Sequence, residues 1–233
     1  MVDKESIYAI PGLGLDGRIF DGLEIPGYEI KVIEYLDPVE NESLDDYVIR
    51  MMANLPQREE AVYLMGHSFG GIIAQEISKK RACKGLILLS TIMDPLELPP
   101  YLSVMRKLPA YDLIKKEIIR RTYFIWGEQD GYNNHEERKI FMEMTDKLSD
   151  YYYRWAVRSV VQWSPIGQVT CPFIRLHGNR DKTFLFRFLK GDFITISGGT
   201  HVVLKAKAEV VNAYIKHFLA KLPKDALKSN HSE

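Results

Sequence analysis

The residues best suited to chemistry are Gly66-His67-Ser68-Phe69-Gly70, where a serine stands between two glycines in the pattern G-x-S-x-G. A serine hydroxyl is a weak nucleophile near neutral pH. It attacks a carbonyl only when a general base removes its proton and a carboxylate orients that base. This pattern therefore directs the search to a histidine and an acid elsewhere in the chain.

The segments on either side of the pattern predict a strand, a sharp turn and a helix. Residues 61–65 are a short apolar run of strand length. After the turn, one side of a helix is apolar (Ile72, Ile73, Ala74 and Ile77) and the other is polar (Gln75, Glu76, Lys79 and Lys80). The two glycines allow strand and helix to meet closely. This arrangement lifts the Ser68 hydroxyl above the sheet edge, at a helix start whose N–H groups favour an oxyanion.

With this context, residues 66–71 (GHSFGG) resemble the nucleophile elbow of the α/β-hydrolase family, and the resemblance extends over most of the chain. It implies a single α/β-hydrolase domain over residues 1–233. The domain is a compact version of the fold, with a mostly parallel sheet of about six strands and helices on both faces. The alternative is a glycine-rich turn in another α/β protein, with an incidental serine.

Six histidines compete for the role of base. The resemblance implies His201, which ends residues 197–201 (SGGTH) directly after the last expected strand. His67 is adjacent to Ser68, so its side chain leaves the turn in a different direction and cannot easily reach the hydroxyl. His177 is expected to pack or cap at a strand end. The others are expected in a lid (His135), on the last helix (His217) and in the tail (His231).

Three aspartates compete for the role of acid. Asp181 follows an expected strand in the pattern G-x-x-D, which is the usual acid motif of the family. Asp130 stands in a similar pattern, but the charged stretch before it suits a lid better than a buried parallel strand. Asp94 follows the central strand, a position that some family members use for the acid. Asp181 is favoured, and Asp94 and Asp130 stay open as alternatives, with helix capping or a turn as their other role.

Acyl transfer also needs donors for the oxyanion that develops on the attacked carbonyl. The resemblance implies two backbone N–H groups, one of Phe69 at the helix start and one of Leu13 in the loop after the first strand. Many relatives have His-Gly in that loop, where this chain has Pro11-Gly12. The other explanation for the loop is a plain glycine-rich turn.

The remaining elements must bring these residues to one place. The expected strands are residues 6–10, 28–35, 61–65, 84–91, 172–176 and 192–197, and the expected flanking helices are residues 42–55 and 205–222. Alternation of strands and helices predicts a parallel sheet, with the site at the carboxyl ends of its strands. Ser43 and Asp46 predict a cap at the start of the first helix.

Residues 94–165 differ from the rest, because they combine prolines with helical patterns and contain no convincing strand. They are expected to form a helical lid over the strand ends, and they carry all three tryptophans, including Trp126. The expected substrate pocket lies between lid and strand ends, with core packing as the other role of the lid aromatics. Its candidate lining residues are Leu15, Met93, Trp155 and Trp163.

Composition limits the classes of partner. The 233 residues are 46% apolar and carry no net charge, which argues against a general nucleic-acid or anionic-membrane binder. No signal peptide or membrane span is visible, and Cys83 and Cys171 are expected to be reduced and buried, so a cytoplasmic location is expected. No metal-ligand spacing or dinucleotide fingerprint is present, so neither metal nor cofactor is expected. The sequence assigns no oligomeric state.

Taken with the resemblance, these residues predict a serine hydrolase that cleaves a carboxylic ester or thioester of a small, apolar substrate. The acyl group would pass through an acyl-enzyme on Ser68. One alternative is other chemistry on the same triad, namely C–C hydrolysis, acyl transfer to an alcohol or cyanohydrin cleavage. Another is a non-catalytic ligand-binding member of the fold.

Overall fold

A six-stranded parallel sheet forms the centre of the molecule, in the order β2-β1-β3-β4-β5-β6. The computed structural model describes residues 4–57, 60–108, 110–121, 127 and 131–223. Its strands are β1 (Glu5–Ile10), β2 (Tyr28–Val32), β3 (Val62–His67), β4 (Cys83–Leu89), β5 (Phe173–Gly178) and β6 (Ile194–Ile196). The predicted parallel sheet is confirmed, although the second and last strands are shorter than the sequence suggested.

The central strands are apolar on both faces because both faces are covered. In β3, Leu64 packs toward one layer of helices and Met65 toward the other. In β4, Leu88 and Ile87 alternate in the same way, and all four side chains are inaccessible to solvent. Strands buried on both faces lose the alternation of apolar and polar residues, which explains their continuous apolar runs.

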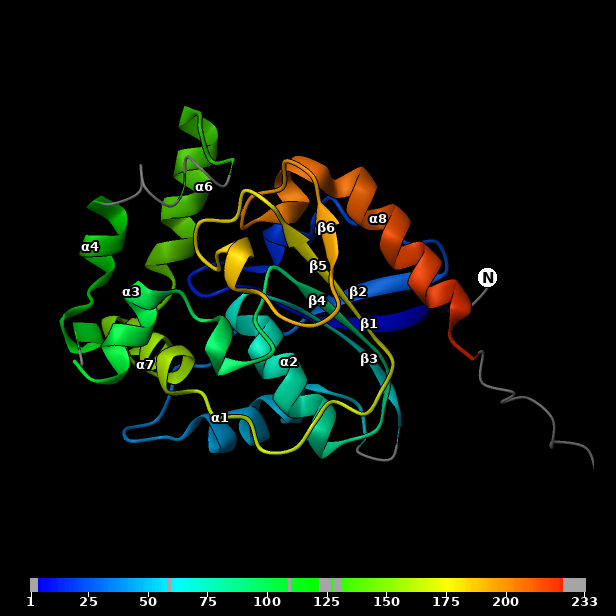
Figure 1. The fold of residues 1–233 in the computed structure, drawn as a ribbon, viewed down its shortest axis with the longest axis horizontal. Helices are drawn as coiled ribbons and strands as arrows, with labels where there is room; N and C mark the ends of the chain where they lie inside the picture. Colours follow the sequence, from blue (N-terminus) through cyan, green and yellow to red (C-terminus); the bar gives the residue numbers. More distant parts are fainter. Residues whose placement is uncertain (1–3, 58–59, 109, 122–126, 128–130, 224–233) are drawn as a thin grey trace, which may run out of the picture.

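Helices cover the two faces of the sheet (Figure 1). The α-helices are α1 (Leu44–Met51), α2 (Phe69–Lys80), α3 (Pro100–Ser103), α4 (Lys116–Arg121), α6 (His135–Asp146), α7 (Asp150–Gln162) and α8 (Val203–Lys221). Short 3-10 segments are η1 (Gly17–Phe20), η2 (Met52–Asn54), η3 (Pro95–Glu97), η4 (Val104–Arg106), η5 (Ala110–Leu113) and η7 (Phe186–Phe188). α1 and α2 lie on one face and α8 on the other. α1 starts at the predicted cap, where the Asp46 N–H donates to Ser43 Oγ over 3.1 Å.

The polar face of α2 is narrower than its sequence predicted. Gln75 was expected on the exposed side but is 2% exposed, and its amide donates to the carbonyls of Gly71 and Ile92. The sheet covers one side of α2, and α1 and α7 contact it on others. A helix enclosed by several elements buries polar side chains that periodicity alone assigns to solvent, and those side chains then need internal partners.

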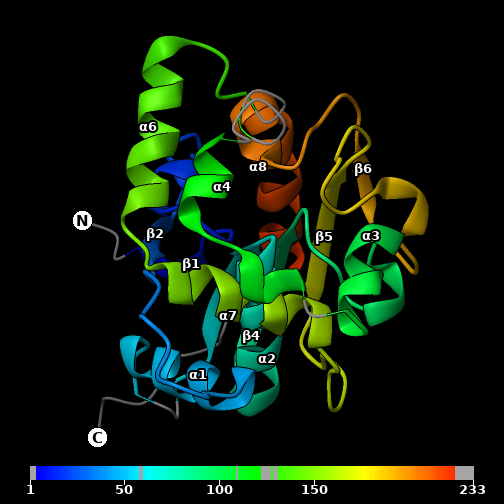
Figure 2. The ribbon, with the colours of Figure 1, turned by 90° about the vertical axis from the view of Figure 1, so that its left-hand side faces the viewer.

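Between β4 and β5 the described residues form helices, 3-10 segments and loops. α3, α4, α6 and α7 gather on one side of the sheet (Figure 1). α4 lies against α6, and α7 lies against α2 (Figure 2). Trp126 and Asp130, which the sequence analysis singled out, lie outside the described residues. Tyr152 and Tyr153, on α7, are completely buried.

The two cysteines are neighbours across paired strands. Cys83 begins β4 and Cys171 precedes β5, and the Cys83 thiol donates to the Gly85 carbonyl over 3.3 Å. Both are free and partly exposed, whereas the sequence suggested complete burial. Among the described helices, none combines the length and apolarity required to cross a membrane.

Candidate active site

Ser68 stands in a strained turn between β3 and α2. Its φ of 54° and ψ of −122° lie outside the regions that a non-glycine residue favours. Hydrogen bonds hold this conformation: the Ser68 N–H donates to the Leu89 carbonyl over 2.9 Å, and Thr91 Oγ1 donates to the Ser68 carbonyl over 2.7 Å. The turn thus places the hydroxyl at the carboxyl end of the sheet.

The glycines of the turn are required by close approach of backbone to backbone. A Cβ on Gly66 would overlap the Gly70 carbonyl and come within 2.5 Å of Gly71 Cα. A Cβ on Gly70 would overlap the carbonyl oxygens of Ile10 and Pro11. The strand, the helix and the loop after β1 therefore meet at a point where side chains do not fit.

The structure brings Ser68, His201 and Asp181 together in a line of hydrogen bonds. His201 Nε2 lies 2.8 Å from Ser68 Oγ, and His201 Nδ1 lies 2.8 Å from Asp181 Oδ2. All three residues are buried, with exposed fractions of 7%, 8% and 4% for Ser68, His201 and Asp181. In this geometry the imidazole can take a proton from the hydroxyl while the carboxylate holds its other nitrogen.

The Asp181 carboxylate is held by four donors. Its Oδ1 accepts the N–H groups of Thr183 and Phe184, over 2.7 and 2.9 Å, while Oδ2 faces His201 and His177. Burial raises the pKa of this carboxyl, but the charge of His201 and the hydrogen bonds of both histidines outweigh burial and hold the pKa well below its usual range. Asp181 is therefore ionised at neutral pH.

The loop after β5, which carries Asp181, and the loop after β6, which carries His201, contact each other at glycines. A Cβ on Gly178, the last residue of β5, would overlap the Gly199 carbonyl. That carbonyl accepts the Arg180 N–H over 2.8 Å, and the Gly198 N–H donates to Asn179 Oδ1 over 2.8 Å. These contacts place Asp181, three residues after Gly178, against His201, two residues after Gly199.

Of the two alternative acids, the structure describes only Asp94. Asp94 caps η3, where its Oδ1 accepts the Leu96 N–H over 2.7 Å. This is the helix-capping role that the sequence left open for Asp94. Asp130 lies outside the described residues, and the described carboxylate that contacts His201 is that of Asp181.

His67 supports the backbone of His201 rather than the nucleophile. Its Nε2 lies 2.9 Å from the His201 carbonyl, which only accepts, so the hydrogen is on Nε2. Nδ1 is buried, and no described residue offers it a hydrogen bond. Burial, assisted by the charge of His201, lowers the pKa of His67 to about 3. His67 is therefore a neutral, completely enclosed support, which the sequence analysis had only excluded as the base.

His177 is a second histidine on the acid. It is completely buried, and its Nε2 lies 2.9 Å from the Phe184 carbonyl and 3.0 Å from Asp181 Oδ2. The His177 N–H, directed at both acceptors, ties the loop that carries Asp181 to the end of β5. The sequence analysis expected only packing or capping here; the available signal was the histidine immediately before the G-x-x-D motif.

The two candidate oxyanion donors lie on facing segments. Phe69 is the first residue of α2, so its N–H has no acceptor within the helix. The loop after β1 lies against the elbow, since a Cβ on Gly12 would come within 2.5 Å of His67 Nδ1. Tyr35 holds this loop: its hydroxyl donates to the Pro11 carbonyl over 2.6 Å, and its ring stacks on Phe69 at 6.1 Å. Within the described part of the chain, neither Phe69 nor Leu13 has an acceptor for its N–H.

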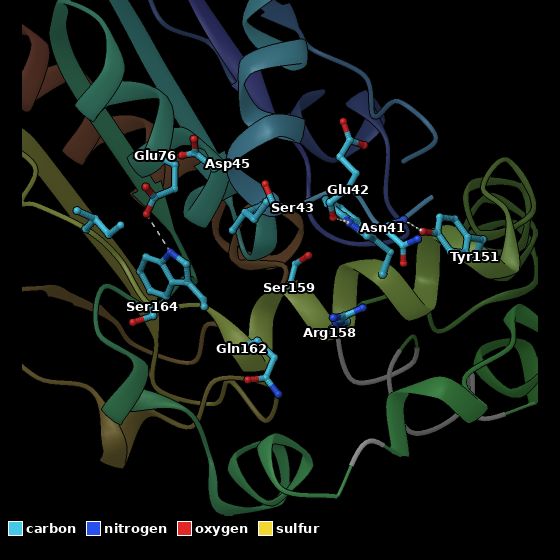
Figure 3. Close-up of a pocket in the computed structure, with 14 residues that line it drawn as sticks. Asn41, Glu42, Ser43, Asp45, Glu76, Tyr151, Arg158, Ser159, Gln162 and Ser164 are labelled. Carbon is cyan, nitrogen blue, oxygen red and sulfur yellow. Dashed lines mark hydrogen bonds between the residues drawn. The ribbon is translucent and has the colours of Figure 1, made fainter. Parts of the chain in front are cut away.

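The four candidate substrate-lining residues are not brought to one place. Leu15 is buried in the core on the α8 side of the sheet, and Met93 packs on the α2 side. Trp155 and Trp163 line a cavity of about 460 Å³ between α1, α2 and α7, whose lining contains none of the triad residues (Figure 3). Trp155 approaches the elbow through Phe69, with 6.0 Å between ring centroids.

Among the residues that the structure describes, no three His, Cys, Asp or Glu side chains form a group that could hold a metal ion. The polar side chains at the site are those of the triad and of the two supporting histidines, and each is engaged with a protein group. The hydrogen-bonded line of Ser68, His201 and Asp181 can support proton transfer from the hydroxyl to the imidazole.

Comparisons with known proteins agree with this architecture. A family model described as the alpha/beta hydrolase family matches residues 8–214. An epoxide hydrolase from Bacillus megaterium superposes with a TM-score of 0.71 at 16% identity, over 93% of this chain and 94% of its own. An esterase from Thermogutta terrifontis superposes with a TM-score of 0.64 at 18% identity, over 93% of this chain and 90% of its own. The RedJ thioesterase from Streptomyces coelicolor superposes with a TM-score of 0.64 at 12% identity, over 92% of this chain and 90% of its own. At these identities the similarity establishes the fold. A comparison with curated proteins found no match.

Proposed function

Because the chain belongs to the alpha/beta hydrolase family, we propose that it is a serine hydrolase that cleaves a carboxylic ester or thioester of a small, apolar substrate. The observation that carries this proposal is the unbroken contact from Ser68 Oγ through the His201 ring to Asp181, with both distances 2.8 Å. A serine, a base and an orienting acid in this order form the arrangement that acyl transfer requires.

The proposed reaction has two halves. His201 Nε2 takes the Ser68 proton as Oγ attacks the carbonyl carbon, and a tetrahedral intermediate forms. His201 then gives that proton to the leaving alcohol or thiol, and the acyl group stays on Ser68. Water, deprotonated by His201, attacks the acyl-enzyme; His201 returns this proton to Ser68 Oγ as the bond to the acyl group breaks and the acid leaves. Asp181 fixes the imidazole tautomer and stabilises the imidazolium.

The proposed oxyanion hole consists of the N–H groups of Leu13 and Phe69. Support comes from the N–H of Phe69 at the start of α2 and from the loop after β1, which lies against the elbow. A preorganised donor of this kind stabilises the transition state by about 2.7–4 kcal/mol. Because both donors are backbone groups, the hole tolerates the absence of the family's usual His-Gly.

The apolar character of the substrate is inferred from the side chains around the elbow. Tyr35, Phe69 and Tyr152 pack together, with the Tyr35 ring 6.1 Å from Phe69 and 5.2 Å from Tyr152. Leu15 and Met93 follow β1 and β4, on opposite sides of the sheet, and we keep them as proposed lining residues on opposite walls of the substrate pocket, with residues 94–165 as the proposed lid. Trp155 and Trp163, which line a separate cavity, are not kept. Esters and thioesters need the same machinery. The esterase and the thioesterase among the structural neighbours are consistent with either bond.

The test is labelling of the purified protein by a fluorophosphonate probe, which reacts with activated serines. We expect labelling of the wild type, no labelling of Ser68→Ala, and a rate at least about a hundredfold lower for His201→Ala. Ser164→Ala, which removes an exposed hydroxyl, serves as the control and should label like the wild type. A series of p-nitrophenyl esters of increasing chain length then measures the acyl preference.

The proposal fails if the folded wild type neither reacts with the probe nor hydrolyses any ester in the series. It also fails if Ser68→Ala labels as fast as the wild type. The first result would favour a ligand-binding member of the fold, since the pocket would then exist without turnover.

A further inference from the structure

The cavity between α1, α2 and α7 is separate from the proposed catalytic serine. Its volume is about 460 Å³, within the usual range for small-molecule sites. The start of α1 with the loop before it, Glu76 of α2, and α7 with the residues that follow it form its walls (Figure 3). We propose that this cavity is a second binding site, which takes a small organic carboxylate with an apolar or aromatic body.

The acidic residues of the cavity wall are already neutralised. Glu42 pairs with Arg50 over 2.6 Å, and Glu76 pairs with Lys79 over 2.8 Å. Asp45 pairs with Lys80. Each carboxylate has its own cation outside the cavity lining, so none of the three needs a cation from a ligand.

Arg158 is the charged group of the lining that has no counterion. Among the described residues it forms neither a hydrogen bond nor an ion pair, and its side chain is exposed at the cavity. Figure 3 shows Arg158 and Ser159 on α7, facing the loop that carries Asn41 and Ser43. The cavity wall therefore has one uncompensated positive charge. A planar guanidinium with free N–H groups matches the two oxygens of a carboxylate.

The other side chains of the lining suit an apolar body. Trp155 and Trp163 are about 5% and 4% exposed, and both indole N–H groups are used: Trp155 donates to the Glu42 carbonyl and Trp163 to Glu76 Oε1. Because both rings are almost fully buried, a ligand can touch only the small part of each ring that borders the cavity. Leu44 and Ile166 extend this apolar surface. A ligand that suits this lining has a carboxylate, which would bind Arg158, and an apolar or aromatic body, which would lie against the tryptophans.

The test measures binding of phenylacetate, with its neutral analogue phenylacetamide as the matched probe, by calorimetry and by tryptophan fluorescence. We expect phenylacetate to bind the wild type, and phenylacetamide to bind about tenfold more weakly because it lacks the charge. Arg158→Gln should weaken phenylacetate binding about tenfold. Arg154→Gln, one turn earlier on α7 and outside the lining, makes the same charge change and should bind like the wild type.

A second variant tests the cavity independently of charge. Ser159→Phe fills the space from the α7 side and should abolish binding of both probes. The proposal is overturned if phenylacetate does not bind the wild type at millimolar concentration, or if Arg158→Gln or Ser159→Phe binds it as well as Arg154→Gln does. The readout is binding, so it does not depend on whether Ser68 is catalytic.

Discussion

At the scale of single residues, three histidines and one aspartate form a buried network in which each histidine has a different task. His201 contacts Ser68 and Asp181, His177 donates to Asp181, and His67 donates to the backbone of His201. His177 and His67 hold Asp181 and His201 in place, since His177 ties the Asp181 side chain, and His67 ties the His201 carbonyl, to a strand end.

Replacement of His177 should lower the reactivity of Ser68. His177→Phe removes a donor from Asp181 Oδ2 and leaves the Phe184 carbonyl without its partner. We expect labelling by the fluorophosphonate to slow about tenfold and the free energy of unfolding to fall by about 1–3 kcal/mol. His177→Gln keeps an N–H at a similar reach and should recover most of the rate. Equal rates in His177→Phe and the wild type would contradict a positioning role.

Replacement of His67 should change how stability depends on pH. The folded protein lowers the pKa of His67 to about 3, whereas the unfolded chain titrates near its ordinary pKa of 6.5. Below pH 6.5 the unfolded state therefore binds the extra proton, and the wild type loses about 1.4 kcal/mol of unfolding free energy per pH unit from this group. His67→Gln keeps a donor for the His201 carbonyl but has no such proton.

Urea unfolding of both proteins between pH 7.5 and 5 measures this effect. The stability of the wild type relative to His67→Gln should fall by about 2 kcal/mol over that range. Asp181 does not affect this comparison. Because its pKa is lowered in the folded protein, its contribution to stability is complete above its pKa in the unfolded chain and is lost only as the pH falls through lower values than those measured here. A difference independent of pH would show that His67 takes up a proton in the folded state.

At the scale of elements, parallel strands bring Ser68, Asp181 and His201 to one edge of the sheet. Ser68 follows β3, Asp181 follows β5 and His201 follows β6, while the loop after β1 lies against the elbow. Parallel strands point their carboxyl ends the same way, so residues far apart in the chain meet there. The α2 N-terminus adds free N–H groups at the same edge.

A side chain at Gly66 should break the elbow. In Gly66→Ala the Cβ overlaps the Gly70 carbonyl, and backbone cannot move aside as a flexible side chain would. We expect the free energy of unfolding to fall by about 3 kcal/mol or more, measured by urea denaturation. Gly22→Ala is the control, since its Cβ would lie 3.1 Å from Ala208 Cβ, and its cost should stay below about 1 kcal/mol. Equal stability of the two variants would contradict the close-approach argument.

At the scale of the whole molecule, one buried ion pair joins the segment after β4 to β5. Arg175 and Glu97 are 2% and 1% exposed, and the guanidinium donates to both carboxylate oxygens, over 2.5 and 3.0 Å. It also donates to the Thr91 carbonyl over 2.8 Å, while Glu97 accepts the N–H groups of Met93 and Lys190. The pair therefore connects the chain where it leaves the sheet to the strand where it returns.

A double-mutant cycle on this pair should show strong coupling. Glu97→Gln leaves Arg175 buried without a counter-charge and should cost about 3–5 kcal/mol of unfolding free energy. Arg175→Met should also destabilise the protein, but the double variant should lose at least about 1 kcal/mol less than the sum of the single losses. Additive losses in urea unfolding would indicate that the two residues act independently.

The amino-acid sequence by itself determined the fold class and the position of the turn at Ser68. Apolar runs, helical spacing and turn glycines are local signals, and the six strands, their parallel direction and the cap at Ser43 followed from them. The G-x-S-x-G and G-x-x-D patterns also singled out Ser68 and Asp181 as candidates, because both patterns reflect a backbone turn that few residues can make.

Only the tertiary structure decided which side chains meet. It placed Asp181 rather than Asp94 on His201, brought His177 and His67 into the network, buried Gln75, and put Trp155 and Trp163 in a separate cavity. Asp181 and His201 are 20 residues apart and His201 and Ser68 are 133 apart. Such contacts depend on how strands and loops pack against one another, and local spacing carries no record of that packing.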